Sequence, residues 1–218
     1  MRVVLMSSLP LVHGDGVDMA AILAGQSKPH PLHEELNAAH DLVVADAIDE
    51  DVLTGADLAI LVQPRALPPE ALVALDDYVR RGGRLLLFTD PMLEWHGGRG
   101  IGDPLGPQRT GLLSPLLSHW GLVLVDPELE WVRLKPSGAV LVHPGVFTPA
   151  QGNTGDGACR IEAEGHVAQC RPGQGRATLV GDADLLDPAM IRESGDSVHA
   201  NRRFVSALIG DLMRKDTS

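Results

Sequence analysis

Residues 68–90 read PPEALVALDDYVRRGGRLLLFTD and carry the clearest structural signal in the chain. The opening Pro-Pro-Glu is typical of a helix start, where proline and an acidic residue are favoured. Apolar residues then recur at helical spacing, and Gly82-Gly83 ends the helix. The near-continuous apolar run Arg84–Phe88 predicts a strand that is buried on both faces of a parallel sheet.

Working outward from this unit, strand-like and helix-like segments alternate along the chain. This alternation predicts a parallel sheet with helices on both faces. We expect one α/β domain over residues 1–218, a three-layer α/β/α sandwich with a mostly parallel central sheet. Short β runs between Gly/Pro-rich turns predict a small β-rich hairpin excursion over about 132–172. The other expected strands are 3–6, 42–45, 58–62, 122–125 and 177–180, and the other expected helices are 17–24, 32–39, 110–119 and 197–214.

Composition excludes several classes of function. Basic and acidic side chains number 18 and 29, so the net charge is 18 − 29 = −11. Nucleic-acid binding needs a basic face, so no nucleic-acid partner is expected. No apolar run approaches the roughly 20 residues that span a bilayer, and Met1-Arg2 leads into a β-like stretch rather than a secretory leader. The glycine patterns match neither a phosphate-binding loop nor a dinucleotide fingerprint, so no cofactor is expected.

Four predicted loops follow predicted strands, and they should meet at one edge of the sheet. Ligands of parallel sheets bind outside the carboxyl ends of the strands. The loops are residues 7–16, 63–68, 89–109 and 181–188. The candidate ligand-binding side chains that they carry are Ser7, Ser8, His13, Asp90, Trp95, Asp182 and Asp184.

Several of these residues suit two roles. Asp182-Ala183-Asp184 offers carboxylate oxygens to a divalent cation, but it lacks the other residues of an EF-hand loop. The same acids suit the start of a short helix, which is the role we expect. His13 suits either metal or acid–base chemistry or an ordinary turn, and we expect no metal site. The long 89–109 loop is either a ligand-contacting loop or a mobile surface loop with Trp95 packed under it.

The two cysteines are spaced for a cross-strand pair. If Glu164-Gly165 forms a two-residue hairpin turn, Cys159 lies opposite Cys170. Opposed residues have Cα atoms about 4.5–5.5 Å apart, which is within disulfide range. A disulfide would indicate an oxidising compartment. The alternative is a pair of reduced, buried thiols in a cytoplasmic protein.

Two stretches resemble the auxiliary domain of gliding-motility-type (GldG-like) ABC transport systems. Leu61-Val62-Gln63-Pro64 leads into residues 68–91, which contain the double glycine, the apolar strand and Asp90-Pro91. The late stretch GRATLVGDAD at 175–184, followed by residues 201–204, is similar to the same family.

The resemblance implies a fold like that of the class I glutamine amidotransferases and a non-catalytic, extracytoplasmic (periplasmic) role beside membrane ABC transporter subunits. The nucleophilic cysteine of the amidotransferases would lie near Thr89-Asp90, where this chain has none, so no catalytic residue is expected. Asn201 and Arg202 at the start of the last helix suit contact with an anion or with a partner's carboxylate, or an ordinary solvated surface.

Two rival functions stay open at this point. One is a metal-dependent or amidotransferase-like hydrolase that uses the Asp and His residues at the strand ends. The other is a sensor that binds a small molecule or a sugar without turnover.

Overall fold

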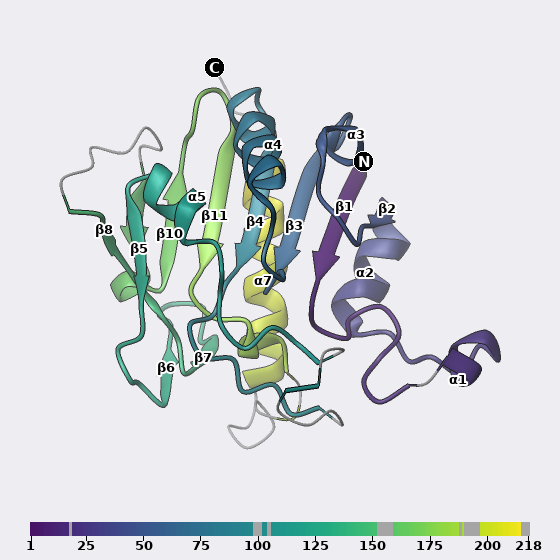
Figure 1. Ribbon diagram of the computed structural model, residues 1–218. Helices are drawn as coiled ribbons and strands as arrows, with labels where there is room; N and C mark the ends of the chain where they lie inside the picture. The colour runs from purple at the N-terminus through teal and green to yellow at the C-terminus, as the bar shows by residue number, and fades with distance from the viewer. Residues whose placement is uncertain are drawn as a thin grey trace.

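A seven-stranded sheet with the order β2-β1-β3-β4-β11-β10-β9 forms the centre of the protein (Figure 1). The structure is a computed structural model that describes residues 1–17, 19–97, 102–103, 106–151, 159–187, 189 and 197–214. The first five strands of that order pair in parallel, so the expected α/β class with a mostly parallel sheet is confirmed. Their bounds are β1 Arg2–Ser7, β2 Asp41–Val44, β3 Leu58–Val62, β4 Arg84–Phe88 and β11 Arg176–Val180.

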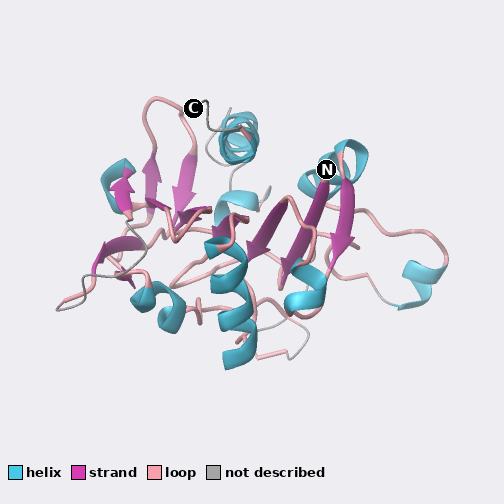
Figure 2. Cartoon of the chain, turned by 90° about the horizontal axis from the view of Figure 1, so that it is seen from above, coloured by secondary structure: helices cyan, strands magenta, loops and turns pink. Residues whose placement is uncertain are grey.

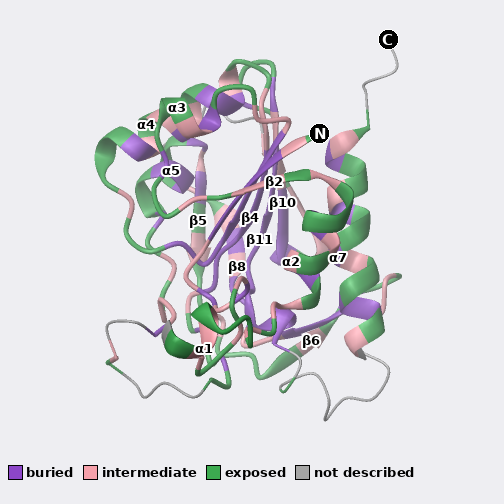
Figure 3. Ribbon diagram, turned by 90° about the vertical axis from the view of Figure 1, so that its right-hand side faces the viewer, coloured by how far each residue is buried: buried purple, intermediate pink, exposed green. Residues whose placement is uncertain are grey.

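The central strands are buried on both faces, as their continuous apolar sequences predict. Every residue of β3 is fully buried, and so are Leu85–Phe88 of β4, because helices cover both sides of the sheet (Figures 2 and 3). Helices α2 (Pro31–Ala39) and α7 (Ser197–Met213) pack on one face. Helices α3 (Glu50–Leu53), α4 (Pro69–Arg80) and α5 (Ser114–His119) pack on the other.

Helix α4 ends in a close contact that requires glycine. Gly82 has φ of 107°, and a Cβ on Gly83 would lie 2.5 Å from the Tyr78 ring. The Tyr78 hydroxyl in turn accepts the Arg84 N–H at 3.2 Å, which joins the helix to the start of β4. No helix within the described ranges is both long and apolar enough to cross a bilayer.

The strands of the β-rich excursion expected over about 132–172 belong to three sheets. Its last two strands, β9 (Arg160–Glu162) and β10 (Val167–Cys170), extend the main sheet because β10 pairs antiparallel with β11. The remaining strands form two small sheets, one from β5 (Leu122–Val125) and β8 (Val146–Pro149), the other from β6 (Trp131–Arg133) and β7 (Val140–Val142). The sequence of a short strand does not indicate which sheet it joins, because that depends on pairing with strands far away in the chain.

Two expected helices are shorter than predicted. The helix expected over 17–24 is α1 (Met19–Leu23), and the one expected over 110–119 begins at Ser114. Pro115 lies in the first turn of α5, where a missing N–H costs nothing. Two short 3₁₀ turns, η1 (Ala163–Gly165) and η2 (Asp184–Leu186), complete the described elements.

Candidate functional site

The carboxyl edge of the sheet brings together the four loops expected there. The strand order reverses between β1 and β3, the place where such sheets usually bind ligands. Ser8 bridges this position: its hydroxyl donates to the Gln63 carbonyl at 2.5 Å and accepts the Gln108 N–H at 3.0 Å. The Ser7 hydroxyl accepts the Leu9 N–H at 2.9 Å within its own loop. Both candidate serines therefore fasten loops over the strand ends.

Gln63, directly after β3, is the strained residue of this edge. Its φ is 42°, in the left-handed region that a residue other than glycine rarely adopts. Its side-chain amide donates to the Asp90 carbonyl at 3.1 Å, and its Oε1 accepts the Asp90 N–H at 2.8 Å. Thr89 and Asp90, the expected counterpart of the amidotransferase nucleophile position, do not share this conformation. Gln63 is fully buried, and these two hydrogen bonds join the end of β3 to the end of β4.

Asp90 and Asp182 are the first two carboxyls of a buried cluster at the ends of β4 and β11. Asp90 accepts the N–H groups of Met92 at 2.7 Å and Ala183 at 3.1 Å. Asp182 accepts those of Val142 at 2.7 Å and Leu185 at 2.9 Å. Both are fully buried, and each joins segments that are far apart in the sequence.

Asp184 and Asp187 extend the cluster to the loop after β4. Asp184 Oδ2 accepts the Glu94 N–H at 2.7 Å, while its buried Oδ1 has no hydrogen-bond partner. Asp187 accepts the His96 N–H at 2.6 Å. These bonds fix the described start of the 89–109 loop over the end of β11.

Burial raises the pKa of three of these carboxyls. The pKa of Asp90 rises to about 6 because burial outweighs the backbone N–H donors that favour its charged form. Burial, followed by the nearby charge of Asp90, raises the pKa of Asp184 to about 8. Burial and the charges of both neighbours also raise the pKa of Asp182 well above its usual value. Burial thus shifts all three carboxyls towards their protonated forms.

Asp182 accepts the Leu185 N–H of η2, as expected for an acid at the start of a short helix, whereas Asp184 lies within η2 and accepts the Glu94 N–H of a distant loop instead of capping a helix. The oxygens of Asp182 are engaged by backbone N–H groups, one of them in η2, and neither side chain reaches solvent. In the described part of the chain, no three His, Cys, Asp or Glu side chains are arranged to share a metal ion. The arrangement suits fastening of loops more than open acid–base chemistry.

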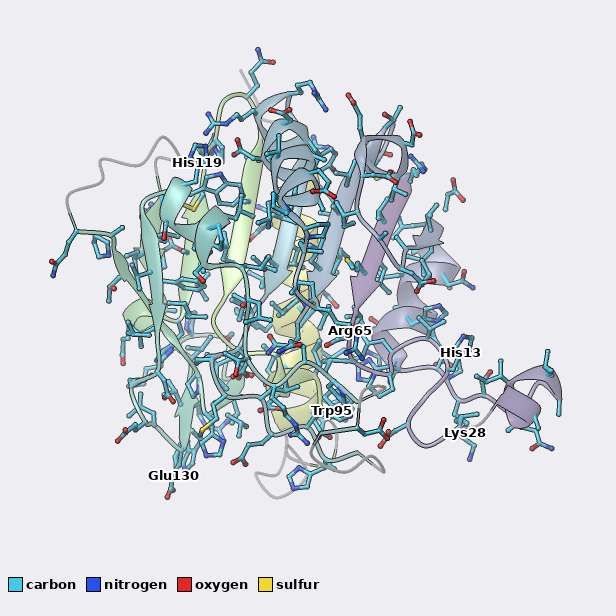
Figure 4. The ribbon with its side chains drawn as sticks, in the orientation of Figure 1. His13, Lys28, Arg65, Trp95, His119 and Glu130 are labelled. Carbon is cyan, nitrogen blue, oxygen red and sulfur yellow. A yellow bond between two sulfur atoms is a disulfide. The ribbon has the colours of Figure 1, made fainter. Side chains whose placement is uncertain are left out.

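His13 and Trp95 lie at the same end of the sheet but in different surroundings (Figure 4). His13 is exposed on the loop after β1, where its carbonyl accepts the Lys28 N–H at 3.2 Å. Trp95 is buried, with its ring centroid 6.5 Å from that of His30. Residues 98–101, 104 and 105 of the predicted 89–109 loop lie outside the described residues.

The structure places Asn201 differently from the expectation. The last helix begins at Ser197, so Asn201 lies in its second turn and is buried. Its Oδ1 accepts the Val140 N–H at 2.7 Å, and its Nδ2 donates to the carbonyls of Val140 and Leu185 at 2.8 and 2.9 Å. These bonds attach α7 to β7 and η2, so this side chain has no capacity left for an anion. Arg202 is exposed and pairs with Glu35 of α2.

A small pocket of about 110 Å³ lies beside this ion pair, between α2, η2 and α7. Its walls are mostly apolar and include Leu32, Leu186 and Val205. His30 Nδ1 accepts the Leu32 N–H at 3.2 Å, so Nε2, 2.9 Å from the Leu186 carbonyl, is the donor. Burial lowers the pKa of His30, which keeps the ring neutral.

Cys159 and Cys170 are joined by a disulfide in the structure. Val167 pairs with Glu162, and continuing this register places the two cysteines opposite each other. The predicted two-residue turn at Glu164-Gly165 is confirmed: the His166 N–H donates to the Ala163 carbonyl at 3.1 Å, and both central residues have positive φ, 59° for Glu164 and 103° for Gly165.

Sequence reasoning missed the roles of Gln63 and His30. A left-handed glutamine has no sequence signature, so the strain at Gln63 was not predictable. His30 precedes Pro31, the first residue of α2. Because proline is favoured at the first position of a helix, Pro31 could have indicated that His30 caps this helix.

Comparison with known proteins gives one family and several distant structures. The profile of a family described as "ABC-type uncharacterized transport system" matches residues 2–150. No curated protein sequence matches the chain. Similar solved structures include the exo-β-1,4-mannosidase Op5Man5 from Opitutaceae bacterium strain TAV5, with 13% identity over 99% of this chain and 36% of that chain and a TM-score of 0.49.

Two further structures show a similar degree of likeness. Cytoplasmic protein STM1381 from Salmonella typhimurium LT2 has 12% identity over 92% of this chain and 96% of its own, with a TM-score of 0.49. A β-galactosidase from Rahnella sp. R3 has 16% identity over 88% of this chain and 31% of its own, with a TM-score of 0.42. The chain thus spans about a third of the length of these glycosidases.

Proposed function

The chain belongs to the family of ABC-type uncharacterized transport systems, and from this premise we propose that it is a non-enzymatic accessory domain of an ABC-type transporter. The family match carries the proposal because it covers well over half of the chain. The expected partners are the membrane subunits of that transporter. Support for the non-enzymatic part comes from Asp90, Asp182 and Asp184, which are buried and bonded to backbone N–H groups.

Three finer assignments belong to the same proposal. The accessory component is of the gliding-motility type (GldG-like), as the stretches at 61–91 and 175–184 suggest. Its fold is a three-layer sandwich like that of the class I glutamine amidotransferases, without their nucleophile. Its location is extracytoplasmic, which the Cys159–Cys170 disulfide supports because such bonds persist in oxidising compartments.

A small-molecule sensor is the second candidate function. The pocket between α2, η2 and α7 favours it, because mostly apolar walls with a few polar groups are typical of small-ligand sites. Its few polar groups suit a small apolar ligand better than a sugar, which needs many hydrogen bonds.

Cross-linking in the native cell tests the accessory role. The tagged, full-length chain should enrich the membrane and ATP-binding subunits of one ABC transporter over an unrelated tagged protein from the same compartment. Enrichment of no transporter subunit would overturn the accessory role. A panel of chromogenic hydrolase substrates, with and without divalent metals, tests the non-enzymatic part, and turnover that a chelator abolishes would overturn it.

A further inference from the structure

The far edge of the main sheet has one apolar face and one polar face. On the first face, Ile161 of β9 opposes Ala168 of β10, which opposes Leu179 of β11. Ala168 and Leu179 belong to the core, and the half-buried Ile161 packs against it. On the second face, the neighbouring row consists of Arg160, Gln169 and Thr178. Helix α7 lies on this second side but packs mainly against β4 and β11 (Figure 1). The outer part of the polar row, Arg160 and Gln169, is therefore left partly or fully uncovered.

A hollow of about 350 Å³ lies between this polar row and the last turns of α7. Its other charged lining residues are Arg171, Arg176 and Asp211. Thr178 is 6% exposed, so it lies at the floor of the hollow rather than on an open surface. The concave shape distinguishes this region from the ordinary solvated face of an edge hairpin.

The charges of the hollow favour an anion. Arg176 donates to the carbonyls of Leu212 and Arg214 and so holds the end of α7. The negative charge of Asp211 is already offset by Arg214 at 2.7 Å. Positive charge remains in a chain whose net charge is −11.

Two arginines of the lining are available to a ligand. Arg171 is exposed, and within the described ranges its side chain has no hydrogen-bond or ion-pair partner. Among the described residues, Arg160 pairs with Glu162 on its own strand and with no other acid, and its side chain is 74% exposed. An exposed pair of this kind contributes little, so the Arg160 guanidinium can turn to a bound anion.

We propose that this hollow binds a phosphate group through the guanidinium groups of Arg160 and Arg171, with Gln169 and Thr178 as neutral donors. Guanidinium groups form paired hydrogen bonds with phosphate oxygens. Four donor groups, three from strands β9, β10 and β11 and one from the residue after β10, suit a tetrahedral anion with several acceptor oxygens better than a carboxylate with two. The phosphate belongs either to a small phosphate ester or to a phospholipid headgroup. This inference goes beyond the accessory role and does not depend on it.

Binding is tested with the full chain and two matched double variants. Arg160→Gln/Arg171→Gln removes the two donors, and Arg133→Gln/Arg203→Gln makes the same charge change outside the hollow. Titration calorimetry at constant ionic strength uses inorganic phosphate and glycerophosphate as probes, with acetate for comparison. Flotation uses phosphatidylcholine vesicles with and without phosphatidylglycerol.

We expect the wild type and the Arg133/Arg203 variant to bind a phosphate probe saturably. The Arg160/Arg171 variant should bind the same probe at least about tenfold more weakly. Flotation with phosphatidylglycerol alone, lost in the same variant, also supports the site and identifies a headgroup as the source. The proposal is overturned if neither probe nor vesicle binds, if acetate binds equally well, or if both double variants lose binding alike.

Discussion

Replacing Asp184 with asparagine should flatten the dependence of stability on pH. The buried carboxyl has a pKa of about 8 in the folded protein and about 4 in the unfolded chain. Between these values the folded state holds a proton that the unfolded state has released. The stability that Asp184 contributes is therefore fully present below about pH 4 and is lost as the pH rises towards about 8.

The size of the effect follows from the same two pKa values. Each pH unit inside the window lowers the free energy of unfolding by up to about 1.4 kcal/mol. Between about pH 5.5 and 7.5 the contribution of Asp184 falls by about 2.5 kcal/mol. The amide introduced by Asp184→Asn keeps an oxygen for the Glu94 N–H but does not titrate. The amide nitrogen takes the place of Oδ1, which has no hydrogen-bond partner, so the substitution also lowers the free energy of unfolding by an amount that does not vary with pH.

Urea unfolding at about pH 5.5, 6.5 and 7.5, at one ionic strength, measures this change. The quantity to compare is the difference in free energy of unfolding between Asp184→Asn and the wild type at each pH. This difference should move in favour of the variant by about 2.5 kcal/mol across the range. Asp126→Asn is the matched control, because Asp126 also accepts a backbone N–H but lies on an exposed turn. A difference that stays constant with pH for Asp184→Asn would refute a protonated buried carboxyl.

Three further substitutions test the other contacts by urea unfolding. Asn201→Ala should lower the free energy of unfolding by about 2–4 kcal/mol, because it leaves buried backbone groups of β7 unbonded; a loss below about 1 kcal/mol would contradict this role. Replacing both Cys159 and Cys170 with serine should lower the free energy of unfolding by about 3 kcal/mol, because a disulfide across 11 residues removes about that much loop entropy from the unfolded chain. An unchanged urea midpoint would show that the disulfide does not form in solution. Gly175→Ala should lower the free energy of unfolding by more than about 2 kcal/mol, because the new Cβ would clash with a carbonyl at the end of α4. Gly210→Ala is the control: its Cβ meets open space, so it should raise the free energy of unfolding by about 0.5–1 kcal/mol. Equal effects of the two substitutions would refute the clash.

The central strands were predictable because their sequences reflect burial on both faces. The segments Leu58–Val62 and Arg84–Phe88 have the bounds expected from the sequence alone. A continuous apolar run bounded by glycine or proline has few other stable environments in a protein with this composition. The helix before β4 was predictable for the same reason, since proline and glycine mark its two ends.

The contacts of the carboxyl edge were not predictable, because their partners lie far away in the sequence. Asp182 bonds to Val142, 40 residues earlier, and Asn201 bonds to Val140, 61 residues earlier. Local patterns indicate that an aspartate after a strand accepts a backbone N–H, but they do not say from which loop. The positive φ of Gln63 and the pairing of β10 with β11 depend on the same kind of distant contact.

The buried cluster holds together the loops at the usual ligand edge of the sheet. An open site acid keeps its charge through contact with water, whereas burial raises the pKa of Asp90, Asp182 and Asp184. To expose any of them, the backbone bonds that fasten η2, β7 and the loop after β4 would have to break together. Each such bond leaves a buried N–H without a partner, at a cost of about 1–3 kcal/mol. These bonds therefore hold the loops of the carboxyl edge together, and the arginine-lined hollow, at the opposite end of β11, does not involve them.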